Sequence, residues 1–408
     1  MVLEMRKMKD SGIEWIGEIP EGWSIARGKH ILTLLQRAVF PTDGVITCFR
    51  DGEVTLRSNR REDGFTVSLK EIGYQGIEPG DLVVHGMDGF AGSIGISDSR
   101  GKSSPVLVVL DSSQDKKYLM YYLRSMAYNN VFLALSTGIR VRSCDLKWNK
   151  LADLLYLVPP IVEQHKLVSF LDEKCSEIDA MLSKTRASIE EYKKLKQAVI
   201  TQAVATQQCS HIKLKYLMNV IVDCPHETPT YSFTGNYYVI RTADQALASL
   251  RRDEDMYRLD ASEYKKRTRR LTLDKDDIVY GREGSWGLAC LVPQSNKYCL
   301  GQRVMQFRCN TRLLYPKYAM YALNSETVYM QGALDTIGST APHVNISTIC
   351  NYLLPVPALN EQKEITNYLD AKCAEIDKLI AKKEQLAKEL ESYKKSLIYE
   401  VVTGKREV

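Results

Sequence analysis

Arginine and lysine side chains in polar and glycine-rich segments are the residues of this chain best suited to bind a ligand. The densest run, EYKKRTRRLTL, spans residues 263–273, and two sparser runs, TLRSNRRED and TGIRVRS, span residues 55–63 and 137–143. A guanidinium group fits both the phosphate oxygens of a nucleic acid and the edge of a guanine base. Arg282 lies in the glycine-rich segment YGREGSWG, where a backbone without side chains can approach a ligand closely.

These basic segments predict a nucleic-acid interface. Any one such residue is more often a solvated surface charge, but basic loops recur in two separate parts of the chain, which favours binding. His343, in GSTAPHVN, is either a contact or a residue that orders its loop, and the sequence leaves both roles open. The residues predicted to contact DNA are Arg57, Arg60, Arg61, Arg140, Arg142, Lys265, Lys266, Arg267, Arg269, Arg270, Arg282 and His343.

The distribution of charge agrees with this prediction. The net charge of the chain is +5, and residues 211–356 hold 18 basic against 14 acidic residues. Residues 159–210 and 357–408 are balanced, with 7 of each sign and 10 of each sign respectively. The excess of positive charge therefore lies outside the two balanced segments, as expected if the remaining parts meet an anionic partner.

Motifs for catalysis or metal binding are not recognisable in the sequence. GISDSRGKS, at residues 95–103, places five residues between its glycines where a phosphate-binding loop needs four. GFAGSIG, at residues 89–95, also departs from the dinucleotide-binding spacing, so we expect both to be turns between strands. The ten cysteines are scattered without a CxxC pair, and no HExxH or GxSxG occurs. We predict no catalytic residue and no metal site.

An internal repeat shows which elements must position the basic residues. EQHKLVSFLDEKCSEIDAML, at residues 163–182, and EQKEITNYLDAKCAEIDKLI, at residues 361–380, are identical at nine positions and lie 198 residues apart. Both follow prolines, where helices often begin. Apolar residues recur at a spacing that averages about 3.5 residues, as in coiled coils. The residues predicted to pair the two helices are Leu171, Cys175, Ile178, Leu182, Leu369, Cys373, Ile376 and Ile380.

Two helices that each carry one apolar stripe bury those stripes most simply against each other, and a similar length and register favour this pairing. Separate helices that each lie on their own domain are the alternative. Cys175 and Cys373 occupy equivalent positions among apolar neighbours, so we expect small core residues rather than nucleophiles.

The segments between the helices also resemble each other. GDLVVHGMDGFAGSIGIS, at residues 80–97, and DDIVYGREGSWGLACLV, at residues 276–292, both predict a strand, a glycine-rich turn and a second strand. The predicted fold class is α+β: two pseudo-symmetric α/β domains separated by a long antiparallel two-helix coiled coil. The predicted boundaries are 1–158 and 208–356 for the two domains, and 159–207 and 357–408 for the two helical regions.

Composition agrees with a globular protein. The chain has 408 residues, of which 44% are hydrophobic and 26% charged, so more than one domain is expected. No apolar segment approaches the roughly 20 residues that a membrane-spanning helix needs, and MVLEMRKMKDSGIEW lacks the apolar region of a signal peptide. Reduced cysteines and a cytoplasmic location are the expectation.

Three features together resemble one family. They are the block WIGEIPEGW at residues 15–23, the Pro-x-x-x-Glu-Gln starts of the two repeated helices and the closing SLIYEVVTGKREV. This arrangement is similar to that of the DNA-specificity (S) subunits of type I restriction–modification enzymes, over essentially the full chain. The resemblance implies two target-recognition domains, each reading one half of a bipartite, asymmetric DNA target, and two conserved spacer helices that set the spacing and dock methyltransferase subunits.

The resemblance also implies the partners and cofactors. The partners would be double-stranded DNA, two methyltransferase (modification) subunits and restriction/translocase subunits, with no membrane. The chain itself would be non-catalytic and bind no cofactor directly, while S-adenosylmethionine, ATP and magnesium would belong to partner subunits that methylate adenine. Two other classes remain as alternatives: a coiled-coil scaffold that does not bind nucleic acid, and a self-sufficient nuclease or methyltransferase.

Overall fold

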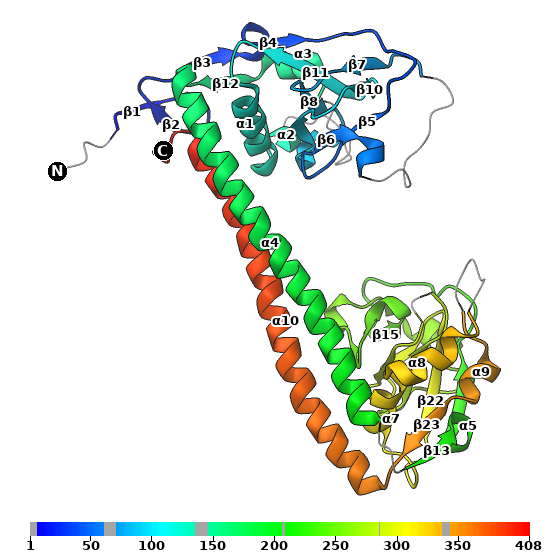
Figure 1. Ribbon diagram of the computed structural model, residues 1–408. Helices are drawn as coiled ribbons and strands as arrows, with labels where there is room; N and C mark the ends of the chain where they lie inside the picture. Colours follow the sequence, from blue (N-terminus) through cyan, green and yellow to red (C-terminus); the bar gives the residue numbers. More distant parts are fainter. Residues whose placement is uncertain (1–5, 61–70, 135–145, 206–208, 285, 337–342) are drawn as a thin grey trace, which may run out of the picture. The chain divides into compact units, whose positions relative to one another are not determined.

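The structure, a computed structural model, describes residues 6–60, 71–134, 146–205, 209–284, 286–336 and 343–408 (Figure 1). The chain divides into two compact units: unit 1 comprises residues 1–184 and 386–408, and unit 2 comprises residues 185–385. Among the described helices, none combines the length and the apolar character that crossing a membrane requires.

The described residues of unit 1 form short strands and three helices before the first long helix. The strands are β1 (Met8–Asp10), β2 (Glu18–Pro20), β3 (Ser24–Arg27), β4 (Leu32–Leu34), β5 (Ile46–Cys48), β6 (Val54–Leu56), β7 (Gln75–Ile77), β8 (Leu82–His85), β9 (Ile94–Ile96), β10 (Gly101–Ser103), β11 (Leu107–Ser112) and β12 (Leu155–Val158). The helices are α1 (Lys116–Tyr128), α2 (Val131–Ala134) and α3 (Trp148–Asp153), with 3-10 turns η1 (Gly28–His30), η2 (Arg57–Asn59) and η3 (Gly89–Ala91).

The core of unit 1 is an antiparallel four-stranded sheet in the order β4-β11-β8-β9. Apolar residues fill β8 and β11 on both faces, and α1 buries one long run of its residues in the same core. Asp115 caps α1 by accepting hydrogen bonds from the amides of Lys117 and Tyr118 at 2.8 and 3.1 Å. The predicted strand, glycine-rich turn and strand of residues 80–97 are confirmed as β8, η3 and β9.

Unit 2 contains a corresponding set of elements. Its strands are β13 (Ser210–Lys213), β14 (Met218–Asp223), β15 (Tyr237–Ile240), β16 (Gln245–Ala246), β17 (Ser249–Leu250), β18 (Arg258–Leu259), β19 (Ile278–Gly281), β20 (Ala289–Leu291), β21 (Tyr298–Leu300), β22 (Val304–Cys309) and β23 (Leu353–Val356). Its helices are α5 (Leu214–Leu217), α6 (Ala261–Arg267), α7 (Pro316–Leu323), α8 (Glu326–Ala333) and α9 (Ile346–Cys350), with 3-10 turns η5 (Thr242–Asp244) and η6 (Asp253–Asp255).

The central sheet of unit 2 has the same connectivity as that of unit 1. Its order is β14-β22-β19-β20, and in both sheets the last strand in sequence lies between the first and the second. In each unit a two-stranded ladder, β12 with β3 and β13 with β23, leads into a long helix. The predicted duplication of the two globular domains is therefore confirmed at the level of strand order.

Unit 2 differs from unit 1 in a small second sheet. Its order is β18-β15-β21, in which β15 pairs parallel with β21 and antiparallel with β18. This sheet has its own apolar cluster, which includes Ile240, Met256 and Tyr298. The two domains thus share a frame and differ in the segments inserted into it.

Two helices of 44 residues each, α4 (Ile161–Val204) and α10 (Leu359–Val402), follow the prolines as predicted. Their start is held by a repeated contact: the side-chain amide of Gln164 donates to the carbonyl of Pro159 at 2.8 Å, and that of Gln362 to Pro357 at 2.9 Å. Both side chains are fully buried. This contact gives a physical reason for the glutamine in both helix starts.

The block at residues 15–23 holds the end of α10 within unit 1. Trp23 is buried, and the hydroxyl of Tyr399 donates to the carbonyl of Trp15 at 3.1 Å. Gly404, with φ of +70°, ends the helix and packs against Pro20 and Trp23 so closely that a Cβ would overlap them. Two of the three features that carry the family resemblance, residues 15–23 and the closing segment of the chain, thus contact each other in unit 1.

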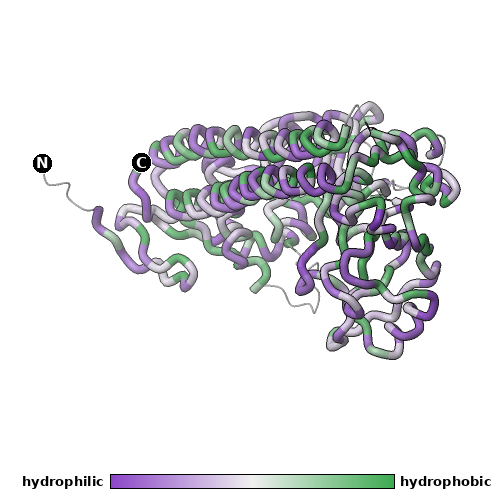
Figure 2. Tube along the Cα trace, turned by 90° about the horizontal axis from the view of Figure 1, so that it is seen from below, coloured by the Kyte–Doolittle hydropathy of each residue, from purple (hydrophilic) through white to green (hydrophobic). Residues whose placement is uncertain are grey.

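Within each unit, one part of α4 and one part of α10 lie side by side and run in opposite directions (Figures 1 and 2). Hydrophilic and hydrophobic residues alternate along both helices (Figure 2). The unit boundaries fall inside the helices, at 184/185 and 385/386, rather than at the predicted domain ends. The reason is that each helix contributes residues to the cores of both units.

Candidate nucleic-acid interface

The described arginines of the first predicted cluster lie at a cavity in unit 1. Arg57 donates from Nε to Thr47 Oγ1 at 3.3 Å, and Arg60 pairs with Asp51 at 2.6 Å and Glu53 at 3.0 Å. The guanidinium of Arg60 also lies 4.2 Å from the centre of the Phe49 ring. Arg61, Arg140 and Arg142 lie outside the described residues.

The cavity beside these arginines has a volume of about 810 Å³, and Tyr74 and His85 also line it. His85 Nδ1 accepts hydrogen bonds from the backbone amides of Met87 and Asp88, at 3.2 and 3.0 Å. Burial lowers the pKa of His85, and because Nδ1 accepts two amide hydrogen bonds, the proton of the neutral ring lies on Nε2. His85 was missed by the sequence analysis, although its place at the end of a strand before a glycine-rich turn is a signal that could have pointed to it.

The basic run of unit 2 forms helix α6 and the turn that follows it. Lys265, Lys266, Arg269 and Arg270 are exposed, as expected for residues that bind an anionic partner. Lys266 pairs with Glu227 at 2.8 Å. Four cationic side chains within six residues leave this surface positive, as phosphate contacts require.

Arg267, in the middle of this run, has a different environment. Only 7% of its surface is exposed, and its guanidinium donates to the carbonyls of Leu300, Glu227 and Pro225 at 3.0, 3.0 and 3.3 Å. These contacts join α6 to β21 and to the loop after β14. Since its donors are engaged inside the domain, Arg267 contributes to the fold, and we leave it out of the proposed DNA contacts.

Arg282 is also buried, in contrast to the expectation of a ligand contact in an open turn. It pairs with Asp223 at 3.1 Å and with Glu283 at 2.8 Å. The backbone of the same turn meets the segment of His343: the amide of Val344 donates to the carbonyl of Arg282 at 3.0 Å, and Glu283 forms a β-bridge with His343. The structure therefore brings two predicted residues, 61 positions apart in sequence, into neighbouring loops.

The same loop pairing occurs in unit 1. There the amide of Leu146 donates to the carbonyl of Gly86 at 2.9 Å, in the positions equivalent to Val344 and Arg282. His343 is exposed and immediately precedes Val344. This repeated contact places Leu146 and Val344 beside the glycine-rich turn of their own domain.

Asp223, Cys224 and His226 are the one group of possible metal ligands among the described residues. The carboxylate of Asp223 is already bound by Arg282 and by His226, at 3.0 Å from the latter. A guanidinium in contact with that carboxylate would oppose a second cation by charge repulsion. The group thus forms an ion-paired network at the end of β14.

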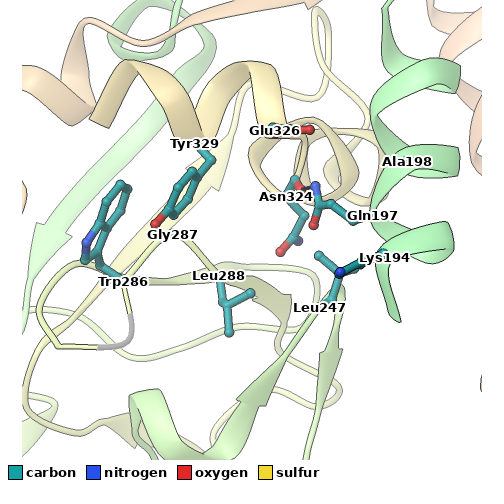
Figure 3. A pocket seen from close by; sticks show the side chains of 10 residues that line it. All are labelled: Lys194, Gln197, Ala198, Leu247, Trp286, Gly287, Leu288, Asn324, Glu326 and Tyr329. Atoms are coloured by element: carbon teal, nitrogen blue, oxygen red, sulfur yellow. Dashed lines mark hydrogen bonds between the residues drawn. The ribbon is translucent and has the colours of Figure 1, made fainter. Parts of the chain in front are cut away.

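A pocket of about 420 Å³ in unit 2 lies behind the glycine-rich turn (Figure 3). One wall is the ring pair of Trp286 and Tyr329, whose centres are 4.3 Å apart and whose planes differ by 4°. Gln197 of α4 faces this pair across the pocket and donates to the carbonyl of Asn324 at 2.7 Å (Figure 3). Gly287 packs against Tyr329, so the aromatic pair fastens the turn to helix α8.

The residues predicted to pair the helices lie in the apolar seam. Leu171, Cys175, Ile178 and Leu182 are buried in the core of unit 1 with Leu397 and Ile398 of α10. Leu369 and Cys373 are buried in the core of unit 2 with Ile200 and Val204 of α4, and Ile376 is buried as well, whereas Ile380 is half-buried. Burial raises the pKa of the Cys175 and Cys373 thiols, which suits core residues better than nucleophiles.

Ion pairs across the seam repeat with the helices and were missed by the sequence analysis. Lys196 Nζ lies 2.9 Å from Asp377 in unit 2, and Lys394 Nζ lies 2.7 Å from Asp179 in unit 1. Both residues of one pair are 198 positions from their counterparts in the other. The offset of 198 residues relates charged residues as well as apolar ones, and comparing the charged residues at this offset could have predicted these ion pairs.

A second repeated contact joins each long helix to its domain. Asp172 accepts from Lys117 Nζ at 2.7 Å and from the Tyr121 hydroxyl at 2.8 Å. The equivalent Asp370 accepts from Lys317 Nζ at 2.5 Å and from the Tyr321 hydroxyl at 2.9 Å. Because the same three residue types recur in both units, the angle between a domain and the adjoining helix segment is defined by equivalent contacts.

Comparison with known proteins agrees with this duplicated architecture. Residues 224–391 match the family described as Type I restriction modification DNA specificity domain. The chain is 21% identical over 425 aligned residues to the putative type I restriction enzyme MjaX specificity subunit of Methanocaldococcus jannaschii, covering 96% of this chain and 95% of that protein. It is 26% identical over 130 residues to the type I restriction enzyme EcoBI specificity subunit of Escherichia coli, covering 32% of this chain and 27% of that protein.

A solved structure from a study of complex assembly and conformational transition in a type I R-M system has the same fold. The TM-score is 0.71 at 15% identity, with 95% of this chain and 99% of that chain covered. The repeated domains and the paired helices thus occur in a chain whose matches are type I DNA-specificity proteins. The chain is therefore similar to the specificity subunits of type I restriction–modification systems, the family that the sequence resemblance suggested.

Proposed function

We propose that each domain reads one half of a bipartite, asymmetric DNA target and that the helical regions set the gap between the halves. The observation that carries this proposal is the duplication: the same strand order, loop pairing and helix contacts occur in both units. The exposed basic residues Lys265, Lys266, Arg269 and Arg270 in unit 2, with Arg57 and Arg60 in unit 1, are the proposed DNA contacts. The two domains share the strand order of the central sheet and differ in the segments between its strands, as expected of domains that read different DNA sequences.

The helical regions are also the proposed docking sites for two methyltransferase subunits. Exposed apolar side chains along them, among them Met181 at 53% and Tyr393 at 50% exposure, suit contacts with a protein partner. Restriction/translocase subunits are further proposed partners of the assembly. S-adenosylmethionine, ATP and magnesium would be bound by these partners in the cytoplasm, and the specificity subunit would contribute target choice alone.

Methylation-site sequencing of a host that carries this chain with its methyltransferase and restriction genes tests the proposal. The expected result is one methylated motif made of two short sequences separated by a fixed number of unspecified base pairs. A host without this gene should lose the motif. A contiguous motif, or methylation unchanged by deletion of the gene, would contradict two-domain recognition.

Binding of double-stranded DNA as a function of salt separates this proposal from a scaffold that does not bind nucleic acid. Lys and Arg contacts to phosphate release counterions, so the affinity should fall steeply as salt rises. A DNA affinity that does not change with ionic strength would favour the scaffold. The purified chain alone should neither methylate nor cut DNA with S-adenosylmethionine or magnesium, because those activities are proposed for its partners.

A further inference from the structure

An aromatic tip projects from the loop between β14 and β15 in unit 2. Phe233 has a relative exposure of 103%, so its ring contacts almost nothing within the domain. Tyr231, two residues before it, and Tyr257 are 42% and 50% exposed, and their ring centres lie 4.6 Å apart. We call Tyr231, Phe233 and Tyr257 the aromatic tip. A scattered exposed ring is ordinary, but three together on one loop and its neighbour form a surface.

The loop that carries the tip is fixed at its beginning by helix α6. The buried guanidinium of Arg267 binds the carbonyls of Pro225 and Glu227, and Lys266 pairs with the Glu227 side chain. Tyr264 of the same helix stacks on Tyr237 of β15 with ring centres 4.0 Å apart. The basic helix and the loop are therefore held as one piece, and Arg267 is the residue that joins them.

The end of the loop is fixed by strand β18. The amide of Ser232 donates to the carbonyl of Arg258 at 2.9 Å. Gly235 lies against the carbonyl of Leu259 so closely that any Cβ would overlap it. Tyr257 is held in turn by Arg241, whose guanidinium lies 3.9 Å from the ring centre. Because both ends are anchored, the position of Phe233 at the surface is built into the fold.

The positive charge of helix α6 and of the turn after it indicates the class of molecule that the tip would bind. Lys265, Arg269 and Arg270 are exposed on or directly after α6, and the described part of the chain shows no ion pair for any of the three. An exposed aromatic side chain, on a loop bound to the helix that carries these cations, fits a duplex, whose backbone is anionic and whose base steps are apolar. Side chains such as Phe partly unstack a base step when they enter a groove, and the resulting bend brings more protein surface onto the DNA.

We propose that Phe233 is a wedge that enters the DNA duplex at a base step of the half-site read by the second domain, while Lys265, Arg269 and Arg270 bind adjacent phosphates. This inference rests on the proposed function, since it places a specific contact within the domain that reads DNA. The paired rings of Tyr231 and Tyr257 lie at the same loop and support its exposed end. The affinity for a half-site would then depend on how easily the base step that Phe233 enters can be unstacked.

The test uses the complex assembled with its methyltransferase subunits and a duplex that carries the motif found by methylation sequencing. Replacing each adenine of the half-site in turn by 2-aminopurine reports unstacking as a rise in fluorescence. The unmodified chain should give this rise at one step, and Phe233→Ala should abolish it and weaken binding roughly 5- to 100-fold. The salt dependence should stay the same, because no phosphate contact is lost.

Tyr216→Ala is the matched control, since Tyr216 is 65% exposed in the same unit but lies outside the aromatic tip. It should leave fluorescence and affinity unchanged. If the Phe233→Ala variant binds with the same affinity and the same fluorescence rise as the unmodified chain, the wedge proposal is wrong. It is also wrong if Tyr216→Ala lowers affinity and fluorescence as much as Phe233→Ala does. If the unmodified complex itself shows no preference for the motif, the proposed function fails. Preference for the motif without any effect of Phe233→Ala defeats the wedge alone.

Discussion

Arg267 and Arg269 are two positions apart, yet their side chains have unrelated surroundings. Arg267 is buried and bound to three carbonyls, whereas Arg269 is exposed beside them. A basic run therefore holds both buried structural residues and exposed residues that are the proposed DNA contacts, and composition does not separate them. The same holds for Arg282, which is buried against Asp223 although its turn is rich in glycine.

Replacing Arg267 by Ala should destabilise unit 2. Three carbonyls would lose their donor and a buried side chain would leave a cavity, at a cost of roughly 3 kcal/mol in the free energy of unfolding. Chemical denaturation of the full chain measures this change. Arg269→Ala is the control and should change stability by less than about 0.5 kcal/mol. Equal stability of the two variants would contradict the structural role of Arg267.

Arg269→Ala and Arg270→Ala should instead weaken DNA binding. Each lost phosphate contact lowers the slope of log affinity against log salt by about 1, and it does so for every DNA sequence alike. Titrations of the assembled complex at several salt concentrations measure the slope. A slope that stays the same in the double variant would remove this surface from the proposed interface.

At the scale of elements, the two long helices combine an apolar seam with repeated polar contacts. The Nζ atom of Lys196 reaches Asp377 from a side chain that is 7% exposed, while the Asp377 side chain is 50% exposed. A cation at the edge of an apolar seam forms its ion pair in one register of the two helices and loses that ion pair in any other register. We infer that these pairs favour the observed alignment of α4 with α10.

A double-mutant cycle with Lys196→Ala and Asp377→Ala measures this contribution. The half-exposed Asp377 is partly screened by water, so we expect a coupling free energy of about 1 kcal/mol. The matched control is the pair Lys372 and Glu375 on α10, whose side chains are 48% and 64% exposed. Its coupling should be below about 0.5 kcal/mol. Equal coupling in both cycles would argue against a role in alignment.

At the scale of the whole molecule, the duplication is the main feature. Two units with one strand order are joined by helices that belong to both, and the unit boundary falls inside each helix. A change in helix length should therefore leave the residues that read DNA untouched. Recognition and spacing are expected to be separable in such a chain.

Inserting seven residues into both α4 and α10 at the unit boundary tests this separation. Two turns keep the seam in register and add about 10 Å, which corresponds to about three base pairs. Methylation sequencing should find both half-site sequences unchanged and the gap longer. A changed half-site sequence with an unchanged gap would contradict the proposed role of the helices as spacers.

The sequence by itself determined the duplication, the long helices and their apolar seam. These depend on periodicity and on an offset of 198 residues, which are local or repeated patterns readable without coordinates. It also located the glycine-rich turns and the strands that flank them. The contacts at the helix starts, in contrast, needed the structure, because Gln164 and Gln362 are polar residues whose burial no hydropathy pattern indicates.

Only the tertiary structure decided which basic residues face solvent. The carbonyls that bind Arg267 are supplied by residues 33 to 42 positions away in sequence, so no local pattern distinguishes it from Arg269. The aromatic tip arises in the same way, since Tyr257 meets Tyr231 across a strand and Phe233 is exposed because nothing distant folds over it. Side-chain type follows from the sequence, whereas exposure is set by which distant segments pack against it.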